Sequence, residues 1–304
     1  MPPSLSSNLP PNSQSTLAGI QQEAQQGNAD AQNRLGLMLS SAQGVPKDNE
    51  QALRWFERAA SQGHADAQNN LGLMYANGRG TPQNYEQALA WFTRAADQGY
   101  ARAQYNLALM YDIGQGVLQD QSSAFSLYLS AAEQGHARAQ CNLGLLYFQG
   151  KGVEQHDGMT LFWLRKAAEQ HQPKAMFQLG LMYERGNGVK SDMAQALAWH
   201  RQAAGLGLTE AQFHLGLLYD SGKGISQDYC QAAQWYAQAA ESGHALAQFN
   251  LGLMYLSGQG VAADREAACK WFAQAKRNGI AKAAKYLASV SPLADQASVD
   301  PLSA

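Results

Sequence analysis

The 304-residue sequence is 45% hydrophobic and carries 22 basic against 24 acidic side chains, for a formal net charge of −2. Binding of nucleic acid or an anionic membrane usually needs a basic excess, so this balance argues against both as partners of the whole surface. The N-terminus lacks the basic start and apolar stretch of a signal peptide, and no run approaches the ~20 apolar residues of a membrane span. We therefore expect a cytoplasmic protein.

The chain begins with a segment that does not resemble a folded element. Residues 1–13 are rich in proline and serine, a composition typical of disorder. Residues 14–27 resemble the second half of the repeat described next. We expect a single helix there that caps the start of an array, as terminal pieces of repeat proteins do.

From residue 28 to residue 279 the sequence repeats itself every 36 residues without an insertion. The segment 71–75, Leu-Gly-Leu-Met-Tyr, returns in related form at residues 107, 143, 179, 215 and 251, and more weakly at residue 35. A fixed period of this length indicates stacked supersecondary units that bury a continuous core. We predict seven repeats.

The pattern within one repeat predicts two helices joined by a turn. In residues 64–99, Ala67, Leu71 and Tyr75 follow the spacing of one helical face. Gly78 and Gly80 end this first helix, and apolar residues between 88 and 96 form a second amphipathic stretch. The predicted fold is therefore all-α, a solenoid of helix-turn-helix repeats.

A shared polar residue marks the start of each second helix. Aspartate or asparagine suits an N-cap, because its side chain accepts a backbone N–H that the first turn leaves free. The fourth repeat has His156 at this position and Asp157 beside it, so we expect its cap to shift by one residue. In the other repeats the position holds Asp48, Asn84, Asp120, Asp192, Asp228 and Asp264.

Alanine and tryptophan recur at fixed positions and predict the packing. The alanines allow a close approach of helices, and the indole rings, with Tyr128 in the third repeat, are expected to form the core between repeats. The alanines are Ala31, Ala67, Ala103, Ala139, Ala175, Ala211 and Ala247. The tryptophans are Trp55, Trp91, Trp163, Trp199, Trp235 and Trp271.

The C-terminal end mirrors the beginning of the chain. Residues 280–290 resemble a lone first helix, in which Lys282 and Lys285 give a more polar face, and we expect a second capping helix. Residues 291–304 have the composition of a disordered tail.

The repeat unit resembles the Sel1-like repeat, a relative of the tetratricopeptide repeat. Four pieces carry the resemblance: the run Ala65 to Tyr75, the turn Gly114 to Val117, the segment Asp192 to Trp199, and the ending Ala95 to Gly99. The resemblance covers residues 28–279. It implies a right-handed superhelix whose first helices line a concave groove, and a role as an adaptor or scaffold for other proteins.

No residue pattern in the sequence indicates catalysis, a cofactor or a metal. The glycine pairs of the turns lie between helices, whereas a dinucleotide fingerprint follows a strand. No histidine stands at a metal-ligand spacing or in an identifiable triad. Cys141, Cys230 and Cys269 fall at unrelated positions of their repeats, and we expect reduced thiols. We therefore predict no enzyme, no cofactor and no bound metal.

Residues that differ between repeats define a candidate partner-binding groove on the first helices. Its cations lie in the middle of the array and its aromatic rings toward the C-terminal half, which suits a protein or peptide segment with acidic groups. The alternative is that the phenylalanines pack against neighbouring repeats, the cations are ordinary solvated surface and the asparagines only bridge adjacent helices. The candidate residues are Arg102, Tyr105, Asn106, Arg138, Asn142, Lys174, Phe177, Phe213, Phe249 and Asn250.

Two readings of the function stay open. The first is a non-catalytic scaffold or adaptor that binds a protein or peptide segment in the groove. The second is an immunity- or inhibitor-type protein that clasps one specific folded enzyme, for which the same groove would serve.

Overall fold

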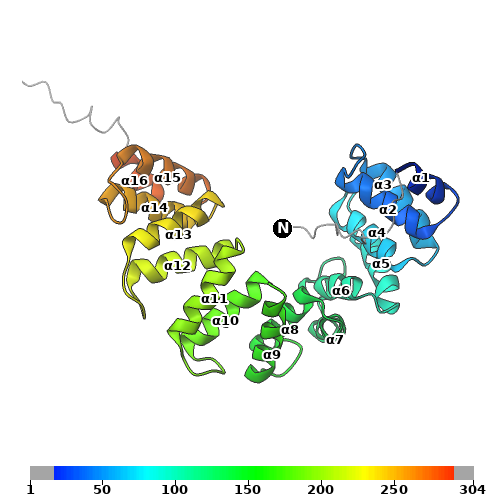
Figure 1. Ribbon diagram of the computed structural model, residues 1–304, viewed down its shortest axis with the longest axis horizontal. Helices are drawn as coiled ribbons and strands as arrows, with labels where there is room; N and C mark the ends of the chain where they lie inside the picture. Colours follow the sequence, from blue (N-terminus) through cyan, green and yellow to red (C-terminus); the bar gives the residue numbers. More distant parts are fainter. Residues whose placement is uncertain (1–16, 291–304) are drawn as a thin grey trace, which may run out of the picture. The chain divides into compact units, whose positions relative to one another are not determined.

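The computed structural model describes residues 17–290, and all regular structure in this range is helical, in sixteen helices (Figure 1). The first helices of the repeats are α2 (Ala29–Ser41), α4 (Ala65–Asn77), α6 (Ala101–Ile113), α8 (Ala137–Gln149), α10 (Pro173–Arg185), α12 (Thr209–Ser221) and α14 (Ala245–Ser257). The second helices are α3 (Asn49–Ser61), α5 (Tyr85–Asp97), α7 (Gln121–Glu133), α9 (Asp157–Glu169), α11 (Met193–Gly205), α13 (Tyr229–Glu241) and α15 (Arg265–Arg277). The predicted all-α repeat fold is confirmed.

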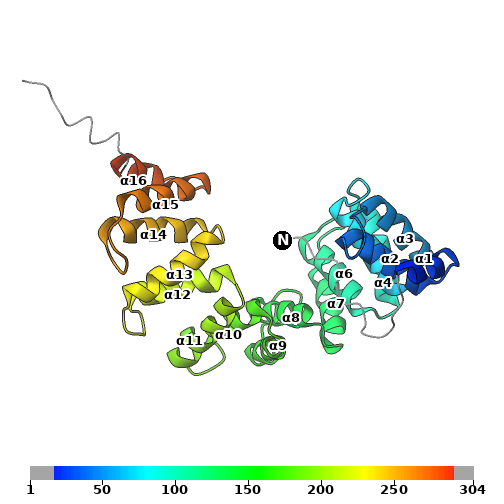
Figure 2. The ribbon, with the colours of Figure 1, turned by 45° about the horizontal axis from the view of Figure 1, so that its top comes forward.

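The chain forms two compact units, unit 1 through Trp163 and unit 2 from Leu164 onward. Single helices stand at the two ends, α1 (Leu17–Gln25) in unit 1 and α16 (Ala283–Val290) in unit 2, inside the segments where capping helices were expected. Within unit 2, helices α12 to α16 follow one another as a stack (Figure 2). The two expected tails lie outside the described residues. Within residues 17–290 no helix is long and apolar enough to cross a membrane.

The glycine pair that follows the first helix in the second to seventh repeats is structural, as expected. Gly78 ends α4 in the left-handed conformation, with φ of 62°, which an L side chain rarely adopts. Gly80 also has positive φ, and a Cβ there would lie 2.3 Å from the carbonyl oxygen of Asn49 in the preceding repeat. The second glycine therefore lets the turn pack onto the backbone of the neighbouring second helix.

Polar side chains cap both helices of most repeats. Aspartate or asparagine caps the second helices as predicted; Asp48, for example, accepts the N–H of Gln51 at 2.8 Å. The expected shift in the fourth repeat is wrong, because His156 itself accepts the N–H of Met159 through its Nδ1 at 3.2 Å. Histidine also caps first helices, as His64 does for α4.

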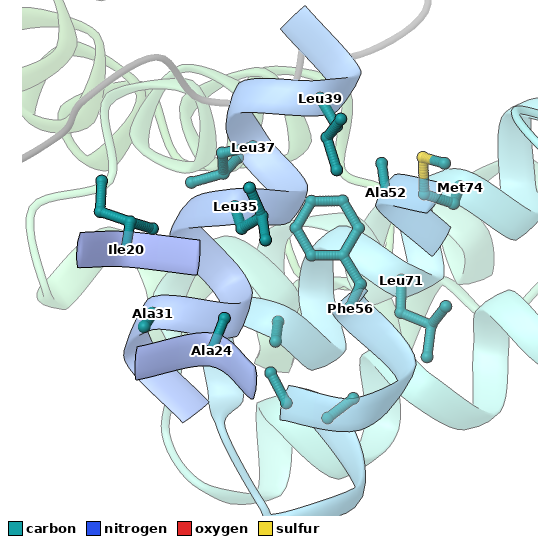
Figure 3. Close-up of a cluster of buried hydrophobic side chains, with 13 residues drawn as sticks. Ile20, Ala24, Ala31, Leu35, Leu37, Leu39, Ala52, Phe56, Leu71 and Met74 are labelled. Atoms are coloured by element: carbon teal, nitrogen blue, oxygen red, sulfur yellow. The ribbon is translucent and has the colours of Figure 1, made fainter. Parts of the chain in front are cut away.

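One side chain from the second helix fills the centre of each repeat core, and it is a ring in every repeat except the fourth. Phe56 is fully buried among Leu35, Leu71 and Met74 (Figure 3). A Cβ on Gly36 would lie 2.7 Å from this ring, so the glycine of the first helix makes the room that the ring occupies. The same position holds the buried residues Phe92, Tyr128, Leu164, His200, Tyr236 and Phe272.

The structure corrects the role predicted for the tryptophans. Apart from the buried Trp163, they are only half-buried, and the central core residue is the one that follows each of them. Tyr128 belongs to this core position, and Leu127 takes the tryptophan's place in the third repeat. Successive helical residues point about 100° apart, so only one of the two faces the paired helix. The Arg58 guanidinium covers the Trp55 ring at 4.6 Å.

A buried glutamine on the first helix links helices of neighbouring repeats in every repeat except the fifth, which has Met176 at this position. Gln68 of α4 donates from Nε2 to the carbonyl oxygen of Ala60 at the end of α3, at 3.1 Å. Its Oε1 accepts from Nε2 of Gln98 after α5, at 2.7 Å. One side chain therefore links three successive helices and satisfies both of its own polar atoms in the core.

Candidate functional site

Two arginines of the predicted groove lie one repeat apart on the first helices of unit 1. Arg102 on α6 is half-buried and Arg138 on α8 is exposed, and neither forms a salt bridge with an acidic side chain of the described chain. Arg102 lines an open cavity of about 580 Å³ together with Tyr100 and His136, the N-cap residue of α8. The structure therefore places Arg102 at a hollow between repeats and Arg138 two residues after His136, which lines the same hollow.

The charges around His136 make this surface electropositive. Burial, followed by the charges of Arg138 and Arg102, lowers the pKa of His136 to about 4. Burial raises the pKa of Tyr105, and the charge of Arg138 opposes that shift. His136 is therefore neutral at pH 7, and the two guanidinium groups supply the positive field that an anionic partner would meet.

In the first two repeats the position of Arg102 and Arg138 holds Asp30 and Asp66, and both carboxylates make contacts within the protein. Asp66 accepts the hydroxyl of Tyr100 at 2.5 Å and Nδ2 of Asn33 at 3.0 Å. Asp30 contacts Nε2 of His64 at 2.9 Å. These bonds join successive first helices, so the carboxylates contribute to packing between repeats.

The asparagines of the predicted groove also make contacts inside the protein. Asn106 is 8% exposed and donates to Oδ1 of Asn69 in the preceding repeat at 2.8 Å. Burial raises the pKa of Tyr128, and a hydrogen bond from Asn142 acts in the opposite direction. Asn250 acts on Tyr236 in the same way. In each case the amide side chain meets a residue of the repeat before its own.

The aromatic residues of the predicted groove pack against neighbouring helices to different extents. The half-buried Tyr105 lies 4.7 Å from the ring of His136. In unit 2 the half-buried Phe213 stacks on His244 at 4.2 Å. Phe249 is 3% exposed, so it offers almost no surface to a partner.

The remaining two residues of the predicted groove lie on α10 of unit 2. Lys174 is exposed in the first turn. Phe177 is half-buried, and its ring centroid lies 5.2 Å from that of His200 and 5.6 Å from that of His214. The described structure thus keeps one free cation and part of one ring at the surface of this helix.

Sequence reasoning missed a cluster of ligand-type side chains in unit 2. Glu184, His200 and His214 come from α10, α11 and α12, and one potential metal-ligand atom of each lies within 4.8 Å of the others. No short-range spacing joins them in the sequence. An alignment of the repeats could have found them, because the equivalent residues of other repeats, such as Asp112, Tyr128 and Asn142, contact one another.

The lowered pKa values of two members of this cluster determine their protonation states. Burial, together with the charge of His214, lowers the pKa of His200 to about 4, although Glu184 opposes the shift. Burial acts to raise the pKa of Glu184, but the hydrogen bond and charge of His214 outweigh it, so the pKa lies below its usual range. At pH 7 the carboxylate is therefore ionised and the His200 ring neutral.

The comparisons with known proteins identify the repeats. The Sel1 repeat model matches residues 29–64, 65–100, 101–136, 137–171, 173–208, 209–244 and 245–280. A search of the curated proteins finds no match.

Two solved structures are similar over most of the chain. A Sel1 repeat protein from Oxalobacter formigenes is 36% identical, with a TM-score of 0.76 over 90% of this chain and 79% of the other. A protective antigen of uropathogenic Escherichia coli with an SLR fold is 34% identical, with a TM-score of 0.70 over 90% of this chain. Only 59% of that antigen's length is covered.

A more distant similarity shows the fold alone. An immunity protein from Pseudomonas aeruginosa is 20% identical, with a TM-score of 0.51 over 70% of this chain and 80% of the other. This identity is too low to favour the immunity-type reading. The seven matches to the family model span nearly all of the described residues, and the chain therefore belongs to the Sel1 repeat family, whose members are generally protein-interaction scaffolds.

Proposed function

We propose that this protein is a non-catalytic scaffold that binds an acidic segment of a partner protein on the first-helix face of unit 1. The observation that carries the proposal is the pair Arg102 and Arg138, two guanidinium groups without an acidic partner in the described chain, of which Arg102 lines an open hollow. Arginine is enriched among the anchors of protein interfaces, because its planar group binds carboxylates through two hydrogen bonds.

Membership of the Sel1 repeat family supports the general role, since that fold is generally a non-catalytic scaffold. Unit 2 carries the exposed Lys174 and the partly exposed Phe177 and Phe213 on its own first helices, whereas Phe249 is buried there. The asparagines contribute by fixing the register of neighbouring first helices. We propose a cytoplasmic location, because a reducing compartment suits a chain whose described cysteines form no disulfide.

Charge reversal on the proposed surface tests the function. The variant Arg102→Glu with Arg138→Glu is compared with the wild type for binding of a labelled peptide of alternating glutamate and leucine. The same proteins then capture partners from a lysate for quantitative mass spectrometry. We expect a loss of affinity of about tenfold or more, since a close charge pair at an interface is worth on the order of 1–2 kcal/mol and the variant adds repulsion. The wild-type affinity should also fall with added salt.

A matched control separates this surface from the total charge. Arg54 on α3 and Arg94 on α5 are exposed on second helices, and the variant Arg54→Glu with Arg94→Glu makes the same change in net charge. The control should keep both the peptide affinity and the captured proteins of the wild type. Equal losses in the two variants, or unchanged binding in both, would remove the first-helix face as the site.

A further inference from the structure

In several repeats three side chains from three successive helices contact one another. Only in the fifth repeat of the described chain are all three of them residues that commonly bind metals. In the third repeat the Tyr128 hydroxyl donates to Asp112 Oδ2 at 3.4 Å, and Asn142 also bonds Tyr128. In the sixth repeat Tyr236 donates to Asp220 at 3.1 Å, again with an asparagine from the next helix. The first helix, the second helix and the following first helix each contribute one member to this triad.

The fifth repeat builds the same triad from different chemistry. Glu184 replaces the aspartate, His200 the tyrosine and His214 the asparagine, so all three members are residues that coordinate transition metals. A tyrosine hydroxyl, a carboxylate and an amide satisfy one another by hydrogen bonds. In the group of two imidazoles and a carboxylate, the ring nitrogens of His200 are left without such hydrogen bonds.

His200 is fully buried, and neither of its ring nitrogens has a hydrogen-bond partner in the described structure. Its Nδ1 edge lies on Gly180, where a Cβ would come within 2.5 Å, and its Nε2 lies 3.5 Å from Glu184 Oε2. This distance exceeds that of an ordinary hydrogen bond. Buried polar atoms are nearly always paired, and an ion is one way in which such an exception is satisfied.

We propose that Glu184, His200 and His214 bind one zinc ion through Oε2 and the two Nε2 atoms. In the described structure Oε2 lies 2.8 Å from Nε2 of His214 and 3.5 Å from Nε2 of His200. Tetrahedral ligands about 2.0–2.1 Å from zinc are about 3.3–3.4 Å from one another. The ion therefore replaces the hydrogen bond between His214 and Glu184, and the side chains separate by about half an ångström.

The ligand set also indicates the kind of site. Two imidazoles and one carboxylate are the ligands of zinc sites that keep a fourth position for water. The side chains of His214 and Glu184 are 22% and 14% exposed, so this fourth position faces solvent, whereas His200 approaches from the core. The ion joins α10, α11 and α12 and pairs a buried nitrogen that is otherwise without a partner.

Titration of the full chain, prepared without a histidine tag, with zinc chloride in a calorimeter tests the proposal. We expect one saturable site per chain. Substitution of zinc by cobalt(II) should give the intense visible absorption of a four-coordinate ion. The variant Glu184→Asp with His200→Tyr and His214→Asn installs the triad of the sixth repeat. It should bind zinc on the order of 100-fold more weakly or not at all, because all three ligands are changed.

A second variant and a control keep the test decisive. His214→Asn alone introduces the residue found at the same position in the sixth repeat's triad, and it should weaken binding even where the triple variant does not fold. His64→Asn alters a histidine outside the triad, and asparagine is itself an N-cap residue, so its zinc binding should equal that of the wild type. Absence of a saturable site in the wild type, or zinc affinity unchanged by His214→Asn, would overturn the proposal.

Discussion

The glutamine that links successive repeats allows a double-mutant cycle whose end point already exists in the chain. Gln68 bonds the carbonyl of Ala60 and the side chain of Gln98. In the fifth repeat the two glutamine positions hold Met176 and Leu206 instead. The substitutions Gln68→Met and Gln98→Leu, made singly and together, therefore convert one polar link into the apolar pair that the protein uses elsewhere.

The contacts set the expected magnitudes. Gln68→Met removes two hydrogen bonds, which corresponds to a loss of about 2 kcal/mol in the free energy of unfolding. Gln98→Leu removes the bond to Gln68 and a longer, exposed one of 3.3 Å to the Arg94 carbonyl. It leaves Gln68 Oε1, on a residue that is 5% exposed, without its partner, a loss of about 1–2 kcal/mol. The double variant has no unpaired side-chain atom, and the Ala60 carbonyl keeps its bond from Gly63 at 3.0 Å. Its loss should be about 2 kcal/mol, well below the sum.

Urea unfolding followed by circular dichroism measures the four corners of the cycle. The control is Gln87→Leu, which makes the same change as Gln98→Leu at an exposed position of α5 whose side chain has no hydrogen-bond partner in the described structure. This control should unfold within about 0.5 kcal/mol of the wild type. Losses that add within about 0.3 kcal/mol would show that the two glutamines are not coupled and refute the reasoning.

Three further measurements follow from single positions. Ser242→Gln should stabilise the protein by about 1 kcal/mol in urea unfolding, because Gln212 Oε1 is buried without a partner where other repeats supply a glutamine; an unchanged midpoint would contradict this. Gly80→Ala should cost about 1–3 kcal/mol more than Gly99→Ala, since both have positive φ but only the former meets backbone within 4 Å; equal melting temperatures would contradict this. The pKa of His136 is lowered to about 4 in the folded protein. Between pH 6.5 and pH 4 the imidazole is therefore protonated in the unfolded chain but not in the folded one, so the stability of the fold declines as the pH falls through this range. His136→Asn should make this decline shallower in melts at pH 7 and pH 5, and an unaltered pH dependence would count against the shift.

The sequence predicted the fold because one pattern was repeated in phase along almost the whole described chain. The periodic leucines, glycines and capping residues each indicate a local structure, and they agree with one another. The central core residue was harder to identify. Trp55 and Phe56 recur together in the period, and only the position of the paired helix decides which one is enclosed. A pattern that repeats two neighbouring residues contains no such information.

The candidate site was predictable only in part. The predicted groove correctly placed Arg102 and Arg138 on the first helices of unit 1, because helical spacing alone determines which residues share a face of a helix. The fate of the aromatic rings depends on the next element along the chain. Phe249 is enclosed because Tyr286 of α16 lies against it, with ring centroids 5.4 Å apart. The capping helix α16 thus covers Phe249 of the last repeat, as the first helix of a further repeat would do.

The fifth repeat differs from its neighbours at several positions that form the contacts between helices. It lacks the glutamine link, having Met176 at that position, and its central ring is His200 in place of an aromatic hydrocarbon or phenol. The first change replaces a polar pair by apolar groups and costs little, whereas the second leaves two ring nitrogens unpaired in the core. A substitution that only served packing would have kept a ring like Phe92 or Tyr236 against the glycine. Glu184 Oε2 and Nε2 of His214 lie beside Nε2 of His200, so the proposed ion gives that nitrogen a partner which a ring such as Phe92 would not need.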